Sequence, residues 1–77
     1  MRERRERFAR MDRTLTARER EVMVLVSNGL SNKEVGRRLN ITEGTVKIHL
    51  YAIYQKVAVN NRTALAKLAT MYRDKWE

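Results

Sequence analysis

One segment in the middle of the chain carries side chains suited to contact another molecule, because they lie on the outer side of a predicted helix. On a helical wheel of about 100° per residue, an apolar stripe falls within about 40° of its first member and predicts a buried face. That stripe consists of Val46, Leu50, Ile53 and Val57. Ile48 and Tyr51 fall near the opposite face, with the ammonium group of Lys47 on its flank. A solvated face rarely carries Ile and Tyr together, so the pattern predicts a contact surface.

The same segment holds the only histidine of the chain, His49, and its surroundings argue against metal binding. The chain has no Cys, and no second His or carboxylate cluster lies one helical turn from His49, so a metal ion would lack ligands. We therefore interpret His49 as a packing residue. No nucleophile and base can be paired, and no Gly-rich phosphate loop occurs, so we expect no catalytic residues, no enzyme activity and no cofactor.

Helix-start signals predict the elements that position this segment. Residues 16–19 and 31–34 both fit the capping box, in which an N-cap hydroxyl and an N3 carboxylate each satisfy a backbone donor. Thr42 and Asn61 are suited to cap two further helices. The predicted helices cover residues 17–28, 32–39, 43–57 and 62–76. The fold class is therefore all-α, a four-helix bundle with room for an additional N-terminal helix.

Helix ends and spacing support this assignment. Gly29 and Asn40 suit the left-handed positions that end the first two helices. The β-branched residues recur at helical rather than alternating spacing, so no strand is predicted. The apolar residues expected in the core come from all four helices. They are Leu15, Val22, Leu25, Val26, Leu30, Val35, Leu39, Ile41, Val46, Leu50, Ile53, Val57, Leu65, Leu68, Ala69 and Tyr72.

A short helix, a tight turn and a longer helix with an exposed N-terminal half form the plan of a helix-turn-helix. In that plan the first helix braces against the phosphate backbone and the second enters the major groove of DNA. Gly36 suits the plan, because a small residue lets the two helices cross closely. The pattern alone is moderately specific, since many helical domains contain it incidentally.

Composition limits the partners. The 77 residues carry 17 Lys and Arg against 9 Asp and Glu, a net charge of +8 that favours a polyanionic partner. The absence of Cys fits a reducing cytoplasm, and no apolar run is long enough to span a membrane or to serve as a signal peptide. We expect a cytoplasmic protein that has no membrane partner.

The first thirteen residues form a basic leader that contains six arginines. Glu3 with Arg7 and Glu6 with Arg10 are spaced as helix-supporting ion pairs. Phe8 belongs to a short apolar stripe beside them. We favour a solvated leader helix packed by Phe8 over an arm that contacts DNA.

Several motifs resemble the LuxR-type, or GerE-type, DNA-binding domain. They are LTARERE (15–21), GLSNKEVGRRL (29–39), ITEGTVKIHL (41–50), YQKV (54–57) and NRTALAKLA (61–69). These motifs occur in order over about residues 14–70. The resemblance implies a transcription-regulatory domain whose third helix reads the major groove and whose fourth helix commonly mediates dimerisation. The predicted domains are then a leader over residues 1–13 and a DNA-binding domain over residues 14–77.

The resemblance also assigns DNA contacts. The expected set is Ser31, Asn32, Lys33, Thr45, Lys47, Ile48 and Tyr51. The segment 31–33 and Thr45 match phosphate-contacting positions, whereas Lys47 is expected to reach a base or a phosphate. Ile48 can offer only apolar contact, such as to a thymine methyl group, while Lys47 can donate to guanine. Tyr51 stands where the family often has a polar residue, so the preferred DNA sequence stays open.

The last helix carries a row of small residues, Thr63, Ala66 and Thr70, beside its core stripe. Small residues allow two helices to approach closely, but by itself the row indicates only a plain helix surface. The resemblance favours a dimer contact. Leu65 is bulkier than the Ala usual in the family, so the packing is expected to differ.

The partners implied are double-stranded DNA, a second copy of the chain on that DNA, and RNA polymerase as a further contact. Three rival interpretations stay open: a helical protein-interaction module, a sigma-factor-like promoter-recognition domain, and a basic amphipathic membrane binder. The third is the weakest, because the apolar faces are needed for the core. Gel shift, partner pull-down and co-purification with RNA polymerase distinguish them. Whether the chain is a standalone regulator or part of a longer protein also stays open.

Overall fold

In the computed structural model, residues 2–76 are described, with side chains from residue 3 onward. The elements in chain order are α1 (Arg2–Thr14), α2 (Ala17–Ser27), α3 (Asn32–Leu39), α4 (Glu43–Val57), α5 (Arg62–Tyr72) and the 3-10 helix η1 (Arg73–Lys75). No strand occurs over residues 2–76, and the predicted all-α fold class is confirmed. None of the described helices is long and apolar enough to cross a membrane. Met1 and Glu77, the outer ends of the two predicted domains, lie outside the described residues.

Both predicted capping boxes are present. The hydroxyl of Thr16 accepts from the Glu19 amide at 3.1 Å, while the Glu19 carboxylate accepts from the Thr16 amide at 2.8 Å. Ser31 and Glu34 make the same reciprocal pair at the start of α3. Each box satisfies two backbone donors that a helix start would otherwise leave without partners. The helices α2 and α3 therefore begin at the residues that the capping boxes predicted.

The helix ends use three left-handed residues, two of which were predicted. Gly29 has a φ of 87° and Asn40 a φ of 58°, as the sequence indicated. Ala58, at the end of α4, also has a φ of 58°. The amide of Val59 donates to the carbonyl of Tyr54 at 3.2 Å and closes this helix end. Alanine has no intrinsic preference for this conformation, so the sequence did not signal it.

The predicted last helix is too long. The α-helix ends at Tyr72, and residues 73–75 form a 3-10 turn rather than the final turn of a helix reaching residue 76. This tighter turn brings Trp76 back toward α1, where its indole N–H donates to Asp12 at 3.0 Å. This contact joins residues 64 positions apart, so the helical periodicity of the segment could not indicate it.

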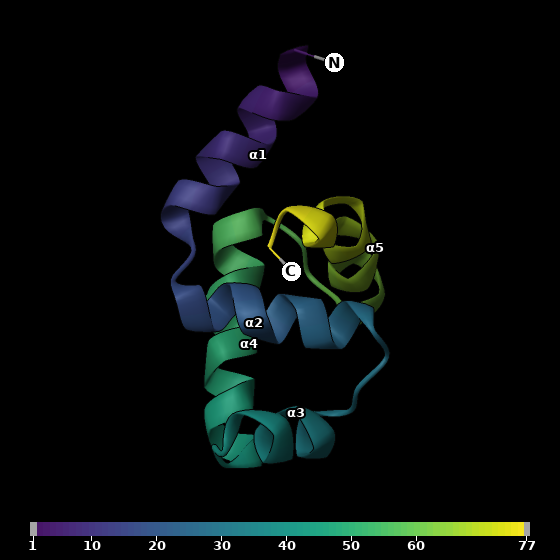
Figure 1. Ribbon diagram of the computed structural model, residues 1–77. Helices are drawn as coiled ribbons and strands as arrows, with labels where there is room; N and C mark the ends of the chain where they lie inside the picture. Colours follow the sequence, from purple (N-terminus) through teal and green to yellow (C-terminus); the bar gives the residue numbers. More distant parts are fainter. Residues whose placement is uncertain (1, 77) are drawn as a thin grey trace.

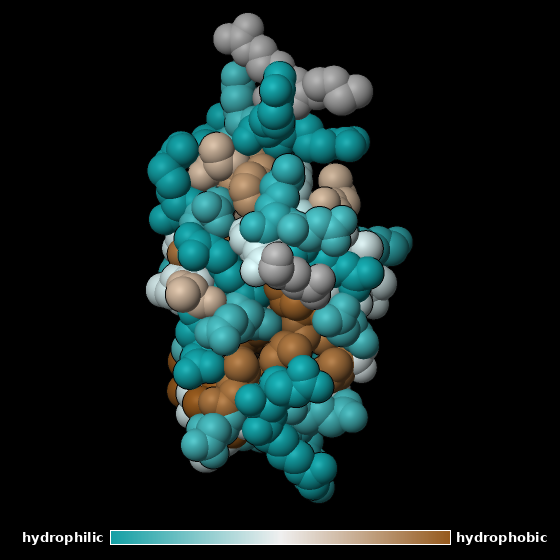
Figure 2. Space-filling view, viewed as in Figure 1, coloured by the Kyte–Doolittle hydropathy of each residue, from teal (hydrophilic) through white to brown (hydrophobic). Residues whose placement is uncertain are grey.

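The core forms where α2 crosses α4 and packs against α5, while α3 lies at the far end of α4 (Figure 1). Most of the predicted core residues are buried, and Met23, which was not predicted, is fully buried as well. Five predicted core residues are only half-buried: Leu30, Leu39, Ile41, Val57 and Leu68. Apolar side chains also gather in an open gap between α2 and α3, on the face seen in Figure 2.

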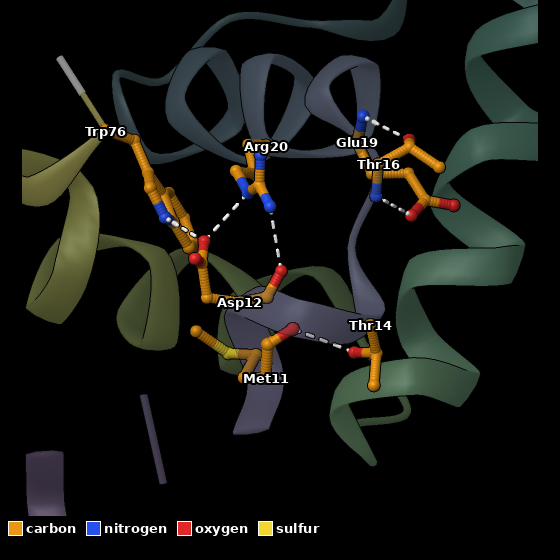
Figure 3. A network of polar contacts seen from close by, with 7 residues as sticks. All are labelled: Met11, Asp12, Thr14, Thr16, Glu19, Arg20 and Trp76. Carbon is orange, nitrogen blue, oxygen red and sulfur yellow. Dashed lines mark hydrogen bonds and ion pairs between the residues drawn. The ribbon is translucent and has the colours of Figure 1, made fainter. Parts of the chain in front are cut away.

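The leader helix α1 is held to the C-terminal end of the chain. The ring of Phe8 lies 5.1 Å from the ring of Tyr72 and 5.8 Å from that of Trp76, which confirms the predicted packing of Phe8. Asp12 accepts from Trp76 and forms an ion pair with Arg20 at 2.7 Å (Figure 3). The predicted pair of Glu3 and Arg7 is also present, at 2.7 Å.

Candidate nucleic-acid interface

The turn between α3 and α4 folds back closely on α3. The amide of Ile41 donates to the carbonyl of Gly36 at 2.9 Å. A Cβ atom on Gly36 would lie only 2.7 Å from the carbonyl oxygen of Ile41. Gly36 was expected to admit the crossing of two helices, and the close approach it admits is that of the turn backbone. The left-handed Asn40 then redirects the chain so that α4 begins after the cap at Thr42.

One face of α4 is buried and the opposite face is open, as the helical wheel predicted. Val46 and Ile53 are fully buried against the rest of the bundle. Ile48 is 69% exposed and Tyr51 is 58% exposed, and Lys47 beside them is exposed as well. An Ile and a Tyr that project into solvent from a helix with a well-packed opposite face form a surface available for contact.

Thr45 is half-buried at the start of this open face. The hydroxyl of Thr42 accepts from the Thr45 amide at 3.1 Å and lies 3.0 Å from the Thr45 hydroxyl. Thr42 is the donor in this second contact, so the Thr45 hydroxyl keeps its own hydrogen for another acceptor. The cap therefore starts α4 and leaves a hydroxyl donor at its N-terminal end, where the helix dipole favours anions.

The N-terminus of α3 holds the other predicted contact residues. Ser31 and Lys33 are exposed, whereas Asn32 is half-buried. The carboxylate of Glu34 accepts from the Ser31 amide at 2.8 Å, and hydrogen bonding to Ser31 lowers the pKa of Glu34 below its ordinary value of 4.5. Glu34 is therefore ionised at neutral pH and locks the first turn of α3, so that Asn32 and Lys33 have fixed backbone positions.

Arg62, the first residue of α5, is a member of this surface that the sequence did not indicate. Its guanidinium donates to the side-chain oxygen of Asn32 at 2.6 Å and to the carbonyl of Leu30 at 2.7 Å. The two partners lie 30 and 32 positions earlier in the chain. No sequence-spacing rule connects residues so far apart, and only the fold brings Arg62 next to the start of α3.

The remaining candidates are His49 and the row of small residues on α5. His49 is half-buried, and no group of three or more potential metal ligands occurs among the described residues. On α5, Thr63 and Thr70 are exposed, while Ala66 is half-buried between them. The hydroxyl of Thr70 donates to the carbonyl of Ala66 at 2.8 Å, so it is already satisfied within the helix. The three residues line one side of α5 and form a shallow surface.

Comparison with known proteins decides the family. The family model described as bacterial regulatory proteins of the luxR family, GerE, matches residues 13–69. The chain belongs to this family. Helices α3 and α4 are therefore the helix-turn-helix of a LuxR-type DNA-binding domain, and the resemblance inferred from the sequence motifs is confirmed.

Relatives of this LuxR-type domain are named as transcriptional regulators. The CsgBAC operon transcriptional regulatory protein of Escherichia coli K12 is 51% identical over 49 residues, which cover 64% of this chain and 23% of the relative. The transcriptional regulatory protein LnrK of Bacillus subtilis 168 is 48% identical over 58 residues, 75% of this chain and 26% of its own length. The nitrate/nitrite response regulator protein NarL of Escherichia coli K12 is 44% identical over 52 residues, 68% of this chain and 24% of its own. The chain spans about a quarter of the length of these relatives. No solved structure matches it.

Proposed function

We propose that this LuxR-type domain binds duplex DNA in a sequence-dependent manner and thereby regulates transcription. In this proposal α4 enters the major groove, and the N-terminus of α3 braces against the phosphate backbone. The observation that carries the proposal is the exposed pair Ile48 and Tyr51 on a helix whose opposite face is buried. An apolar pair beside Lys47 suits a groove floor that offers thymine methyl groups and guanine acceptors.

The proposed contacts divide into two classes. Ser31, Asn32, Lys33 and Thr45 would donate to phosphates and position the domain without reading sequence. Lys47, Ile48 and Tyr51 would meet base edges and determine which sequence is bound. The division follows from the placement of the first class at two helix N-termini and of the second on the open face of α4.

We further propose that two copies meet on DNA through α5. The row of Thr63, Ala66 and Thr70 allows close approach but offers little apolar surface. Such a contact is weak in solution and becomes sufficient when adjacent half-sites hold two copies at high effective concentration. A two-fold contact of this kind requires inverted half-sites.

The domain organisation and remaining partner follow from the same proposal. We assign residues 1–13 to the leader and residues 14–77 to the DNA-binding domain. A regulator bound at a promoter lies beside RNA polymerase, which we propose as the protein partner of the DNA-bound state. The charge of +8 supplies the electrostatic attraction that brings the domain to DNA.

Salt dependence of binding tests the proposal. Affinity for a fluorescently labelled duplex is measured by anisotropy over a range of salt concentrations. We expect the logarithm of affinity to fall with the logarithm of salt, with a slope of about −0.9 for each phosphate neutralised. Lys33→Gln should make the slope shallower by about 0.9, because one phosphate contact is lost.

The matched control is Lys75→Gln, which removes the same charge from an exposed residue in η1. Lys75 borders the gap between α2 and α3, and none of the proposed DNA-contact residues lines that gap. This variant should leave the slope unchanged. A flat salt response of the wild-type domain, or equal changes in slope for both variants, would contradict the proposed DNA interface.

A further inference from the structure

Arg62 connects the first turn of α5 to the first turn of α3. It is half-buried, and its guanidinium spans two acceptors: the side-chain oxygen of Asn32 at 2.6 Å and the carbonyl oxygen of Leu30 at 2.7 Å. Hydrogen bonds from a guanidinium are short and strong, and its planar fork fixes the direction of both partners. The side chain of Asn32 in α3 is therefore held by Arg62 of α5.

This arrangement determines which atom of the Asn32 amide is engaged by the protein. A guanidinium has donors only, so it must engage the oxygen of the amide, and the NH₂ group is left to donate elsewhere. Among the described residues no protein acceptor binds that NH₂ group. The group lies at the start of α3, next to the exposed Lys33, where backbone amides and the helix dipole also favour an anion.

We propose that Arg62 is a positioning residue for phosphate binding, which acts by aiming the Asn32 NH₂ group at the DNA backbone. The inference rests on the proposed function and assigns to it a residue outside the helix-turn-helix. Arg62 does not touch the phosphate itself. It holds the donor in place before DNA arrives, so that binding does not have to order the Asn32 side chain.

A double-mutant cycle separates this role from general stabilisation of the fold. Affinity for one duplex is measured for wild type, Asn32→Ala, Arg62→Lys and the combined variant. Lysine keeps the positive charge but lacks the fork, so it cannot hold both Asn32 and the Leu30 carbonyl. We expect each single variant to weaken binding about tenfold, as for loss of a hydrogen bond to a charged group. The combined variant should be no weaker than either single variant, because both remove the same contact.

Lys33→Ala provides the matched comparison. Lys33 neighbours Asn32, but its side chain is not held by Arg62, so its effect should multiply with that of Arg62→Lys. Lys33→Ala should also make the salt slope shallower by about 0.9. Arg62→Lys should leave that slope unchanged, because its charge is retained. Fully multiplicative effects of Arg62→Lys and Asn32→Ala would overturn the proposal, and so would an affinity of Arg62→Lys within twofold of wild type.

A second variant keeps the test informative if Arg62→Lys folds poorly. Asn32→Asp preserves an acceptor for Arg62, and therefore the link between the helices, but it replaces the outward NH₂ group by an anionic oxygen. It should remain folded by circular dichroism and weaken DNA binding more than Asn32→Ala does. If Asn32→Asp binds DNA as tightly as Asn32→Ala does, or more tightly, the proposal is overturned. If wild type itself fails to bind duplex, the proposed function fails; if wild type binds and responds to Lys33→Ala alone, only the role of Arg62 fails.

Discussion

The ammonium of Lys56 donates to the carboxylate of Glu19 at 2.8 Å, across 37 positions of sequence. The carboxylate oxygen that accepts from Lys56 also accepts from the Thr16 amide at 2.8 Å. Glu19 is 4% exposed, so the pair joins the N-terminus of α2 to the last turn of α4 at the edge of the core. One carboxylate thus both caps α2 and holds α4, the helix that carries the exposed Ile48 and Tyr51.

Replacing Glu19 by Gln should destabilise the domain by about 1–2 kcal/mol, because the capping acceptor is kept but the charge opposite Lys56 is lost. Urea unfolding followed by circular dichroism measures the change. Glu34→Gln is the matched control, since Glu34 occupies the same position of the second capping box but is exposed and has no lysine partner. A loss no larger than that of the control would show that the Lys56 contact contributes nothing.

The stabilisation by Glu19 should depend on pH. Burial opposes ionisation of Glu19, but hydrogen bonds from Lys56 and Thr16 outweigh it and lower the pKa below its ordinary value of 4.5. A depressed folded-state pKa stabilises the fold above the unfolded value, and this contribution is lost as the pH falls through the folded value. The difference in unfolding free energy between wild type and Glu19→Gln should therefore shrink as the pH drops below about 4.5. A constant difference down to acid pH would contradict this explanation.

Gly36 and Gly44 should respond in opposite directions to substitution by Ala. A Cβ at Gly36 would press on the Ile41 carbonyl at 2.7 Å, and backbone cannot easily yield, so we expect a loss of about 1–3 kcal/mol. At Gly44 the nearest atom outside its own helix backbone is 3.8 Å away, and Ala should stabilise the helix by about 0.5–1 kcal/mol. Thermal unfolding of the two variants measures both changes in stability and their signs. If Gly36→Ala is neutral, the turn does not require the close approach seen here.

Most local features of this fold could be predicted from sequence, and long-range ones could not. The local exception is the left-handed Ala58, because alanine has no preference for that conformation. The capping boxes, the left-handed Gly29 and Asn40, and the open face of α4 depend on residues within a few positions of each other, so spacing indicates them. The pairs Asn32 with Arg62 and Glu19 with Lys56 depend on how helices cross. Each residue alone looks like an ordinary polar side chain, and only packing brings the partners together.

The proposed contact through α5 can be broken by charge. Ala66→Glu should abolish cooperative occupancy of a duplex with two half-sites, because two buried carboxylates would repel each other, while affinity for a single half-site stays nearly unchanged. Ala64→Glu is the matched control: Ala64 and Ala66 are both half-buried and flank the buried Leu65 on opposite sides of the helix. Gel shifts with one and two half-sites provide the readout. Cooperative binding that survives in Ala66→Glu would place the interface elsewhere.

The most direct test of the account is selection of binding sites from random duplex DNA by three proteins: wild type, Ile48→Ala and Lys33→Ala. Ile48→Ala should alter the preferred base at one or two positions, by about 1–3 kcal/mol, because Ile48 is assigned to a base edge. Lys33→Ala should select the wild-type site with uniformly weaker affinity, because a phosphate contact carries no sequence information. The opposite result, an unchanged site for Ile48→Ala and a shifted site for Lys33→Ala, would contradict the assignment of α4 as the reading helix and α3 as the bracing helix.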